Sequence, residues 1–171
     1  LCEPGSKSQS FLTETGHDFI AINFPASTPR KLFIADADNA IRIWKDQVDS
    51  CGFRKASSDE WRYLDIVSGV PWVTLATSEE FIPQMLNLDK LGGISFNKGC
   101  YTGQEIVART HYLGKAKREM VLAECQTAIL PEPNSSIINR DGEGQEVVGK
   151  VLQVQQDGQG CKMQVILQIA E

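Results

Sequence analysis

One cysteine stands out among the residues that could do chemistry. Cys100 lies two residues before Thr102, which forms a Thr-x-x-Glu spacing with Glu105 and predicts the start of a helix. Unpaired backbone N–H groups and the helix dipole at such a start, together with the neighbouring Lys98, favour a thiolate at position 100. The alternative is that Cys100 is a small buried side chain, the commoner environment of a free cysteine.

Basic residues gather in the same stretch. Between positions 98 and 118 the single acid is Glu105, and the basic residues are Lys98, Arg109, Lys115, Lys117 and Arg118. The whole chain is acidic, with 17 Lys+Arg against 22 Asp+Glu. A cationic patch on an acidic protein indicates an anionic partner, either nucleic-acid phosphate or a ligand with carboxylates; the alternative is a solvated face whose charges pair with acids from elsewhere. The stretch has no RNP motif or recognition helix, which argues against direct RNA binding.

Metal chemistry has little support in the sequence. The five cysteines form no C-x-x-C pair, and neither of the two histidines has the spacing of a metal-binding motif. We therefore predict no metal site and expect a reducing compartment. No apolar stretch approaches the roughly 20 residues of a membrane helix, so we expect a soluble protein without a membrane partner.

Both helices and strands are predicted in the chain that must position Cys100. Alternating apolar residues predict strands over 19–24 and 31–35, and apolar stripes predict helices that end at Gly52 and Gly69. Around Cys100 the sequence predicts a short strand over 94–96 and a helix from Thr102 to about Gly114. Four strands follow, over 120–125, 135–139, 147–155 and 162–169, with turns at Asp141-Gly142 and Asp157-Gly158.

This order of elements predicts an α+β fold in three parts. Residues 1–72 form a ferredoxin-like α+β domain, residues 73–115 form the segment that carries Cys100, and residues 116–171 form an antiparallel β-barrel-like domain.

The string Lys98-Gly99-Cys100-Tyr101-Thr102-Gly103-Gln104-Glu105 resembles the K-G-C-[FY]-x-G-Q-E signature of the YgfZ family, which comprises folate-binding proteins linked to iron–sulfur protein maturation and tRNA modification. The resemblance extends over the following segments: Phe81-Ile82-Pro83-Gln84, Asn87-Leu88, Leu91-Gly92-Gly93-Ile94-Ser95-Phe96, Val107-Ala108-Arg109 and Gly114. The family is similar to the T-protein of the glycine cleavage system. The resemblance implies a T-protein-like architecture of which this chain is a C-terminal fragment, lacking the N-terminal part that supplies half of the folate pocket.

The resemblance implies tetrahydrofolate as the cofactor, with residues 73–115 belonging to the folate-binding core. Trp61 matches a family tryptophan associated with folate, whose indole could stack on the ligand; the alternative is that Trp61 only packs in an apolar stripe with Leu64. Further folate contacts are expected from Lys98, Tyr101, Gln104 and Arg109. Cys100 is the candidate catalytic or redox-active thiolate. Relatives often carry Glu-Ala-Gly where this chain has Val67-Ser68-Gly69, so a carboxylate for the pterin ring is missing there.

Three functions follow from these residues. The first is a folate-binding accessory protein that supports iron–sulfur enzymes or their assembly factors and is linked to tRNA only indirectly. The second is a tetrahydrofolate-dependent aminomethyltransferase, which needs a positioned carboxylate that the chain does not offer. The third is a non-enzymatic interaction module. The first is favoured, in the cytoplasm or alternatively in the mitochondrial matrix, and whether the protein is an enzyme stays open.

Overall fold

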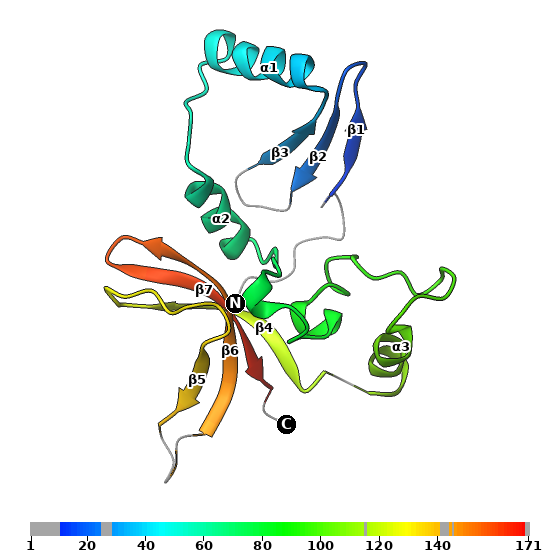
Figure 1. The fold of residues 1–171 in the computed structure, drawn as a ribbon, viewed down its shortest axis with the longest axis vertical. Coiled ribbons are helices and arrows are strands. Elements are labelled where there is room, and N and C mark those ends of the chain that lie inside the picture. Colours follow the sequence, from blue (N-terminus) through cyan, green and yellow to red (C-terminus); the bar gives the residue numbers. More distant parts are fainter. Residues whose placement is uncertain (1–10, 25–28, 115, 141–143, 145, 170–171) are drawn as a thin grey trace. The chain divides into compact units, whose positions relative to one another are not determined.

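The computed structural model describes residues 11–24, 29–114, 116–140, 144 and 146–169. The chain divides into two compact units, residues 1–64 and 65–171, which are treated separately below. Helices and antiparallel sheets occur together, which confirms the predicted α+β class (Figure 1). The predicted domain boundaries at 72/73 and 115/116 stay predictions.

The first unit contains a three-stranded antiparallel sheet in the order β1-β2-β3, followed by helices. Its elements are β1 (Thr13–Thr15), β2 (Ile20–Phe24), β3 (Arg30–Ile34), α1 (Ala37–Lys45), the π-helical turn η1 (Asp46–Ser50) and the start of α2 (Ser58–Val67). The two predicted strands are confirmed. Strand β1 was not predicted, because its sequence has no alternation of apolar and polar residues. The three described strands form a simple meander, without the strand–helix–strand connection of a ferredoxin-like unit.

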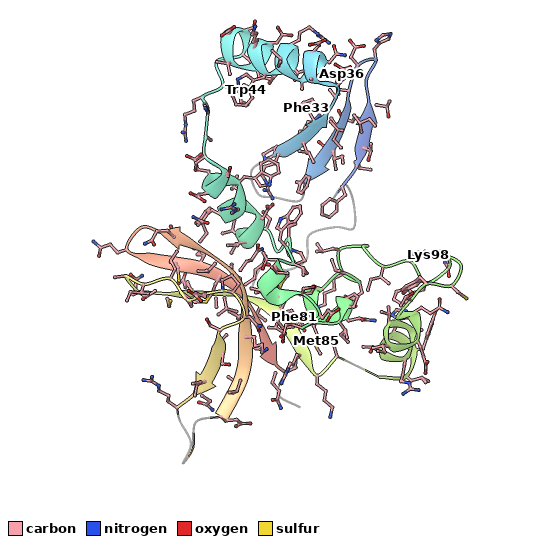
Figure 2. The ribbon with its side chains drawn as sticks, in the orientation of Figure 1. Phe33, Asp36, Trp44, Phe81, Met85 and Lys98 are labelled. Atoms are coloured by element: carbon pink, nitrogen blue, oxygen red, sulfur yellow. The ribbon has the colours of Figure 1, made fainter. Side chains whose placement is uncertain are left out.

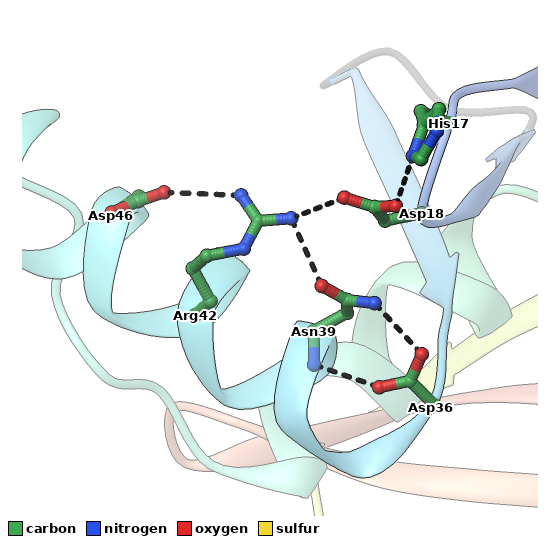
Figure 3. A network of polar contacts seen from close by, with 6 residues as sticks. All are labelled: His17, Asp18, Asp36, Asn39, Arg42 and Asp46. Atoms are coloured by element: carbon green, nitrogen blue, oxygen red, sulfur yellow. Dashed lines mark hydrogen bonds and ion pairs between the residues drawn. The ribbon is translucent and has the colours of Figure 1, made fainter.

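A polar network fixes the start of α1. The Asp36 carboxylate accepts a hydrogen bond from the Asn39 backbone N–H at 2.9 Å, and the bonds from Asn39 lower the pKa of Asp36. One turn later, Arg42 donates to Asp18 at 3.0 Å and lies 4.0 Å from Asp46 (Figure 3). These ion pairs are exposed and contribute little energy individually, so the cap is the main local signal for this helix.

Helix α2 has well-defined ends. Ser57 Oγ accepts from the Glu60 N–H at 3.3 Å and so caps the first turn of the helix. At the other end Gly69 has a φ of +72°, its N–H bonds Ile66 O, and the Val70 N–H bonds Asp65 O at 2.9 Å. This is a Schellman motif, which explains why glycine ends the helix.

The second unit is built around a four-stranded antiparallel sheet in the order β4-β7-β6-β5. Its elements after α2 are the 3₁₀ turns η2 (Leu75–Thr77) and η3 (Pro83–Leu86), α3 (Gln104–Leu113), β4 (Arg118–Cys125), β5 (Ser136–Asn139), β6 (Glu146–Asp157) and β7 (Gly160–Gln168). All four predicted strands are confirmed. The described strands form an open sheet that does not close into a barrel. The turn at Asp157-Gly158 is confirmed by a φ of +59° at Gly158, and Asp141-Gly142 lies outside the described residues.

Apolar side chains cover both faces of this sheet. On one face Leu86 of η3 forms a buried cluster with Leu152 and Ile166. Met85 of η3 and the preceding Phe81 pack against this cluster (Figure 2 labels both). The other face carries a second buried cluster, composed of Val151, Cys161, Met163 and Val165. Two-sided burial explains why consecutive residues are buried in both strands, Val151 and Leu152 in β6 and the run from Met163 to Ile166 in β7.

A buried glutamine ties the end of α2 to the sheet. Gln164 in β7 is only 1% exposed, and its Nε2 lies 3.0 Å from Ile66 O and 3.3 Å from Asp65 O. Its Oε1 accepts from Gln153 Nε2 at 2.9 Å, and Gln153 also donates to Val70 O. Carbonyls at the end of α2 thereby gain side-chain donors from the sheet.

Two local predictions around Cys100 are wrong. Residues 94–96 form no strand, because a three-residue alternation needs a neighbouring strand and none of the described strands pairs with it. Helix α3 begins at Gln104 with Gly103 as its N-cap, and no side chain caps it, so the Thr102/Glu105 capping box is not formed. Within the described ranges, no helix is both long and apolar enough to cross a bilayer.

Candidate functional site

Cys100 lies in a loop that is held by hydrogen bonds between two residues that follow it in the chain. The loop follows the turn at Gly92, where φ is +72°, and runs irregularly to Gly103, where φ is +85°. Gln104 Oε1 accepts from the Tyr101 N–H at 3.2 Å, and the Gln104 N–H donates to Tyr101 O at 3.2 Å. These two bonds fix the residue after Cys100 to the first turn of α3. The Gln104 side chain thus holds the loop at the helix start, where the sequence had predicted a capping box.

The thiol of Cys100 is exposed. The alternative of a buried filler is therefore wrong for this position. The Lys98 ammonium lies 4.8 Å from the centroid of the Tyr101 ring, within the range of a cation–π contact. The structure thus brings Lys98, Cys100, Tyr101 and Gln104 together in one small loop.

Arg109 lies further along α3 and has its own partner. Its Nη2 is 3.2 Å from Glu105 Oε1, an exposed pair one helical turn apart. Such pairs are worth a few tenths of a kcal/mol and exchange readily for another anion. Lys117 and Arg118 are also exposed, while Lys115 lies outside the described residues. The predicted cationic patch is thus partly paired within α3.

Trp61 lies on α2 in the first unit, where it is half-buried. Its ring meets the Phe24 ring edge to face, at 5.4 Å between centroids and 72° between planes. The guanidinium carbon of Arg30, a residue only 6% exposed, lies 4.6 Å from the Trp61 ring centroid. The indole therefore packs in an aromatic–cation cluster that sequence reasoning missed, since no local pattern links Arg30 to α2.

Comparison with known proteins decides the family. No protein-family model matches the chain. The tRNA-modifying protein YgfZ of Edwardsiella ictaluri (strain 93-146) is 41% identical to it over 142 residues, which are 81% of this chain and 42% of that protein. The chain belongs to the YgfZ family. It spans about two fifths of the length of this curated relative.

Two features of this YgfZ-family chain were not predicted. Gln84 and Asn87, quoted above only as part of the resemblance, line a pocket at the far end of α3 from Cys100. The ten residues of α3 separate the two places by about 15 Å. In addition, Cys125 and Cys161 face each other across β4 and β7, with 3.2 Å between their sulfur atoms. Among the described residues, no three His, Cys, Asp or Glu side chains form a group that could hold a metal ion.

The environments of the cysteines predict an order of reactivity. Cys51 and Cys100 are exposed, whereas burial, aided by the hydrogen bond with Cys125, raises the pKa of the Cys161 thiol to about 11. At pH 8 only about one Cys161 side chain in a thousand would be the reactive thiolate. We expect iodoacetamide at pH 8 to modify Cys51 and Cys100 well before Cys161, as read by peptide mass spectrometry. Modification of Cys161 should accelerate about tenfold with each pH unit and level off only near pH 11. Equal rates for the three cysteines at pH 8 would contradict the structure.

Proposed function

We propose that this YgfZ-family protein is a tetrahydrofolate-binding accessory factor that supports iron–sulfur enzymes and, through them, tRNA modification. The observation that carries the proposal is an exposed Cys100 inside the family signature, in a chain 41% identical to a protein named for tRNA modification. A solvent-accessible thiol is suited to exchange with a thiol, a disulfide or a metal centre on a partner. The link to tRNA is indirect in this proposal.

Residues in each of the two units, taken separately, offer groups that suit parts of tetrahydrofolate. Folate offers a flat ring system and a glutamate tail with carboxylates. Trp61 offers an aromatic surface, although Arg30 lies over its ring, so the ligand would have to use indole surface that Arg30 leaves uncovered. Lys98 offers an ammonium, and Arg109 can exchange Glu105 for a ligand carboxylate. When bound, tetrahydrofolate would supply one-carbon or redox chemistry.

One-carbon transfer by this chain itself is not part of the proposal. The aminomethyltransferase reaction needs a carboxylate positioned at the folate nitrogen. Between positions 98 and 118 the only carboxylate is Glu105, and it is exposed and paired with Arg109. No specific contact favours the enzyme over the accessory factor.

The cysteine is tested by a matched pair of substitutions. Cys100→Ser and Cys51→Ser each remove one exposed thiol from the chain. In cells that lack their own YgfZ-family protein, each variant is expressed in the full-length protein, and the iron–sulfur-dependent methylthiolation of tRNA is measured by mass spectrometry. We expect Cys51→Ser to restore the modification fully and Cys100→Ser to leave at most about a tenth of it. Full restoration by Cys100→Ser would overturn the role of the thiol.

Folate binding is tested separately. Titration of tetrahydrofolate should change the tryptophan fluorescence of the protein, and Trp61→Phe should remove most of that change while Trp44→Phe retains it. We expect Cys100→Ser to bind tetrahydrofolate as the unaltered protein does. A signal that survives Trp61→Phe unchanged, with the same affinity, would remove Trp61 from the folate site.

A further inference from the structure

Cys125 and Cys161 form a pair of thiols that the proposed function does not use. Cys125 is the last residue of β4, Cys161 is the second residue of β7, and the two lie directly opposite each other in the antiparallel ladder. Their sulfur atoms are 3.2 Å apart, at hydrogen-bond distance for two thiols. A disulfide bond is about 2.05 Å long, so the sulfur atoms would have to approach each other by only about 1 Å.

The backbone at this position suits a disulfide. Residues directly opposite in an antiparallel pair have Cα atoms about 4.5 to 5.5 Å apart, and a disulfide needs roughly 4.4 to 6.8 Å. The two strand ends are also held close together. A Cβ atom at Gly160 would lie 2.4 Å from Cys125 O, and in the adjacent pair Lys162 Nζ lies 3.7 Å from Glu124 Oε2. A bridge between the thiols therefore needs no change of register.

The pair lacks the further ligands of a metal site. A structural zinc ion takes four protein ligands as a rule, and no group of three candidate ligands occurs among the residues that the structure describes. Packing in the cluster that contains Cys161, Met163 and Val165 requires apolar neighbours, but it does not require two sulfur atoms to meet. Contact between the sulfur atoms is the additional feature that a disulfide needs.

The two thiols differ in their access to solvent. Cys125 is partly exposed, whereas Cys161 is only 2% exposed, so an oxidant from solvent reaches Cys125 first. The pair also forms the last position of the β4–β7 ladder, and strand ends open locally more readily than strand centres. Cys161 then has to react only with the sulfur atom beside it.

We propose that Cys125 and Cys161 are a redox modification site, which forms a reversible disulfide by exchange with a low-molecular-weight disulfide. The Cys125 thiolate attacks one sulfur of the small disulfide, which forms a mixed disulfide and releases one small thiolate. Cys161 then loses its proton and attacks Cys125 Sγ, which breaks the mixed disulfide and releases the second small thiolate. The protein thiols lose two electrons, the small disulfide is reduced to two thiols, and these take up the two protons of the cysteines.

The second step is fast in spite of the raised pKa of Cys161. With a pKa of about 11, roughly one Cys161 side chain in a thousand is a thiolate at pH 8. Well-oriented groups within one molecule react as if present at about 10⁵ M or more, which outweighs that factor.

The bridge would have a structural consequence. It would close the chain between Cys125 and Cys161, which includes β5 and β6, and so restrict the unfolded state and stabilise the second unit. In a reducing compartment the pair stays as thiols, and the bridge forms when the compartment becomes oxidising. This site goes beyond the proposed folate role and does not involve Cys100.

The test uses the full chain with Cys2, Cys51 and Cys100 replaced by serine, so that the pair supplies the only two thiols. The probe is oxidised glutathione, added to the folded and fully reduced protein at pH 8. We expect the intact mass to fall by two hydrogen atoms and proteolysis to yield a peptide that links Cys125 to Cys161. The Tm should rise by about 5 °C or more, and dithiothreitol should reverse both changes.

The matched control adds Cys125→Ser to the same chain. This partly exposed position tolerates serine, and circular dichroism checks that the variant is folded. With the same oxidant its mass should not change, because Cys161 is buried, and its Tm should shift by less than about 1 °C. A lasting glutathione adduct on Cys125 without the linked peptide would overturn the proposal. No reaction of the folded protein, or a bridge that forms only in urea, would do the same, since the sulfur atoms would then only pack together.

Discussion

Replacement of Gln164 with alanine is expected to lower the free energy of unfolding of the second unit by about 4 kcal/mol. Gln164 is fully buried in β7 and donates to the carbonyls that end α2. Alanine removes these bonds and leaves a cavity beside Gln153. Since a domain of this size has a total stability of only about 5 to 15 kcal/mol, much of the protein should be unfolded in mild denaturant. Urea titration followed by circular dichroism measures the loss.

A second variant at this position separates hydrogen bonding from packing. Gln164→Leu keeps most of the volume and removes only the amide. Ile66 O and Asp65 O keep their Schellman bonds, and Val70 O keeps the bond from Gln153, so the loss should be about 1 to 2 kcal/mol. Gln156→Ala, an exposed glutamine of β6, should stay within about 0.5 kcal/mol. If the alanine and leucine variants were equally stable, packing at this site would contribute nothing.

Gly149→Ala is expected to destabilise the same unit by about 3 kcal/mol. A Cβ atom at Gly149 would lie 2.3 Å from Ile166 O and 2.6 Å from Leu167 Cδ2, so β6 would have to move away from β7. The reduced entropy of the unfolded chain offsets only about 0.4 to 1 kcal/mol of this.

Gly144→Ala is the matched control, because its Cβ would meet no atom of the described residues within 4 Å. It should change the stability by less than about 0.5 kcal/mol in the same urea titration. If the Gly149→Ala protein were as stable as the control, the distance between β6 and β7 at this position would have to be larger than in the structure.

The C-terminal sheet was predictable because its signals are local. Residues 147–155 and 162–169 are apolar enough for buried strands, and Asp157-Gly158 joins them where the structure has a positive φ. Helix ends were predictable for the same reason at Ser57 and Gly69.

The surroundings of Cys100 were predictable only in part. The signature residues lie in one loop and the first turn of α3, yet the strand and the capping box predicted around them do not form. Gly103 adopts a left-handed φ that ends the loop one residue later than Thr102 would have done. Sequence spacing does not determine which of two adjacent residues caps a helix when both are compatible with a turn.

The pairings between distant segments could not be predicted. Gln84 meets Val107, Asn87 meets Met120, and Cys125 meets Cys161 only after η3, α3 and the sheet have packed. Each partner is more than 20 positions away, and no periodicity within one element encodes such a contact. The pocket is for this reason a property of the fold rather than of a motif.

The irregular backbone before Cys100 bears on how this segment can evolve. In a strand, the insertion or loss of one residue would turn every following side chain to the opposite face. Residues 94–97 belong to no ladder, while the Tyr101–Gln104 bonds fix the loop to α3 on the other side of the thiol. A change of loop length upstream would therefore not turn the Cys100 side chain to the opposite face, as it would in a strand.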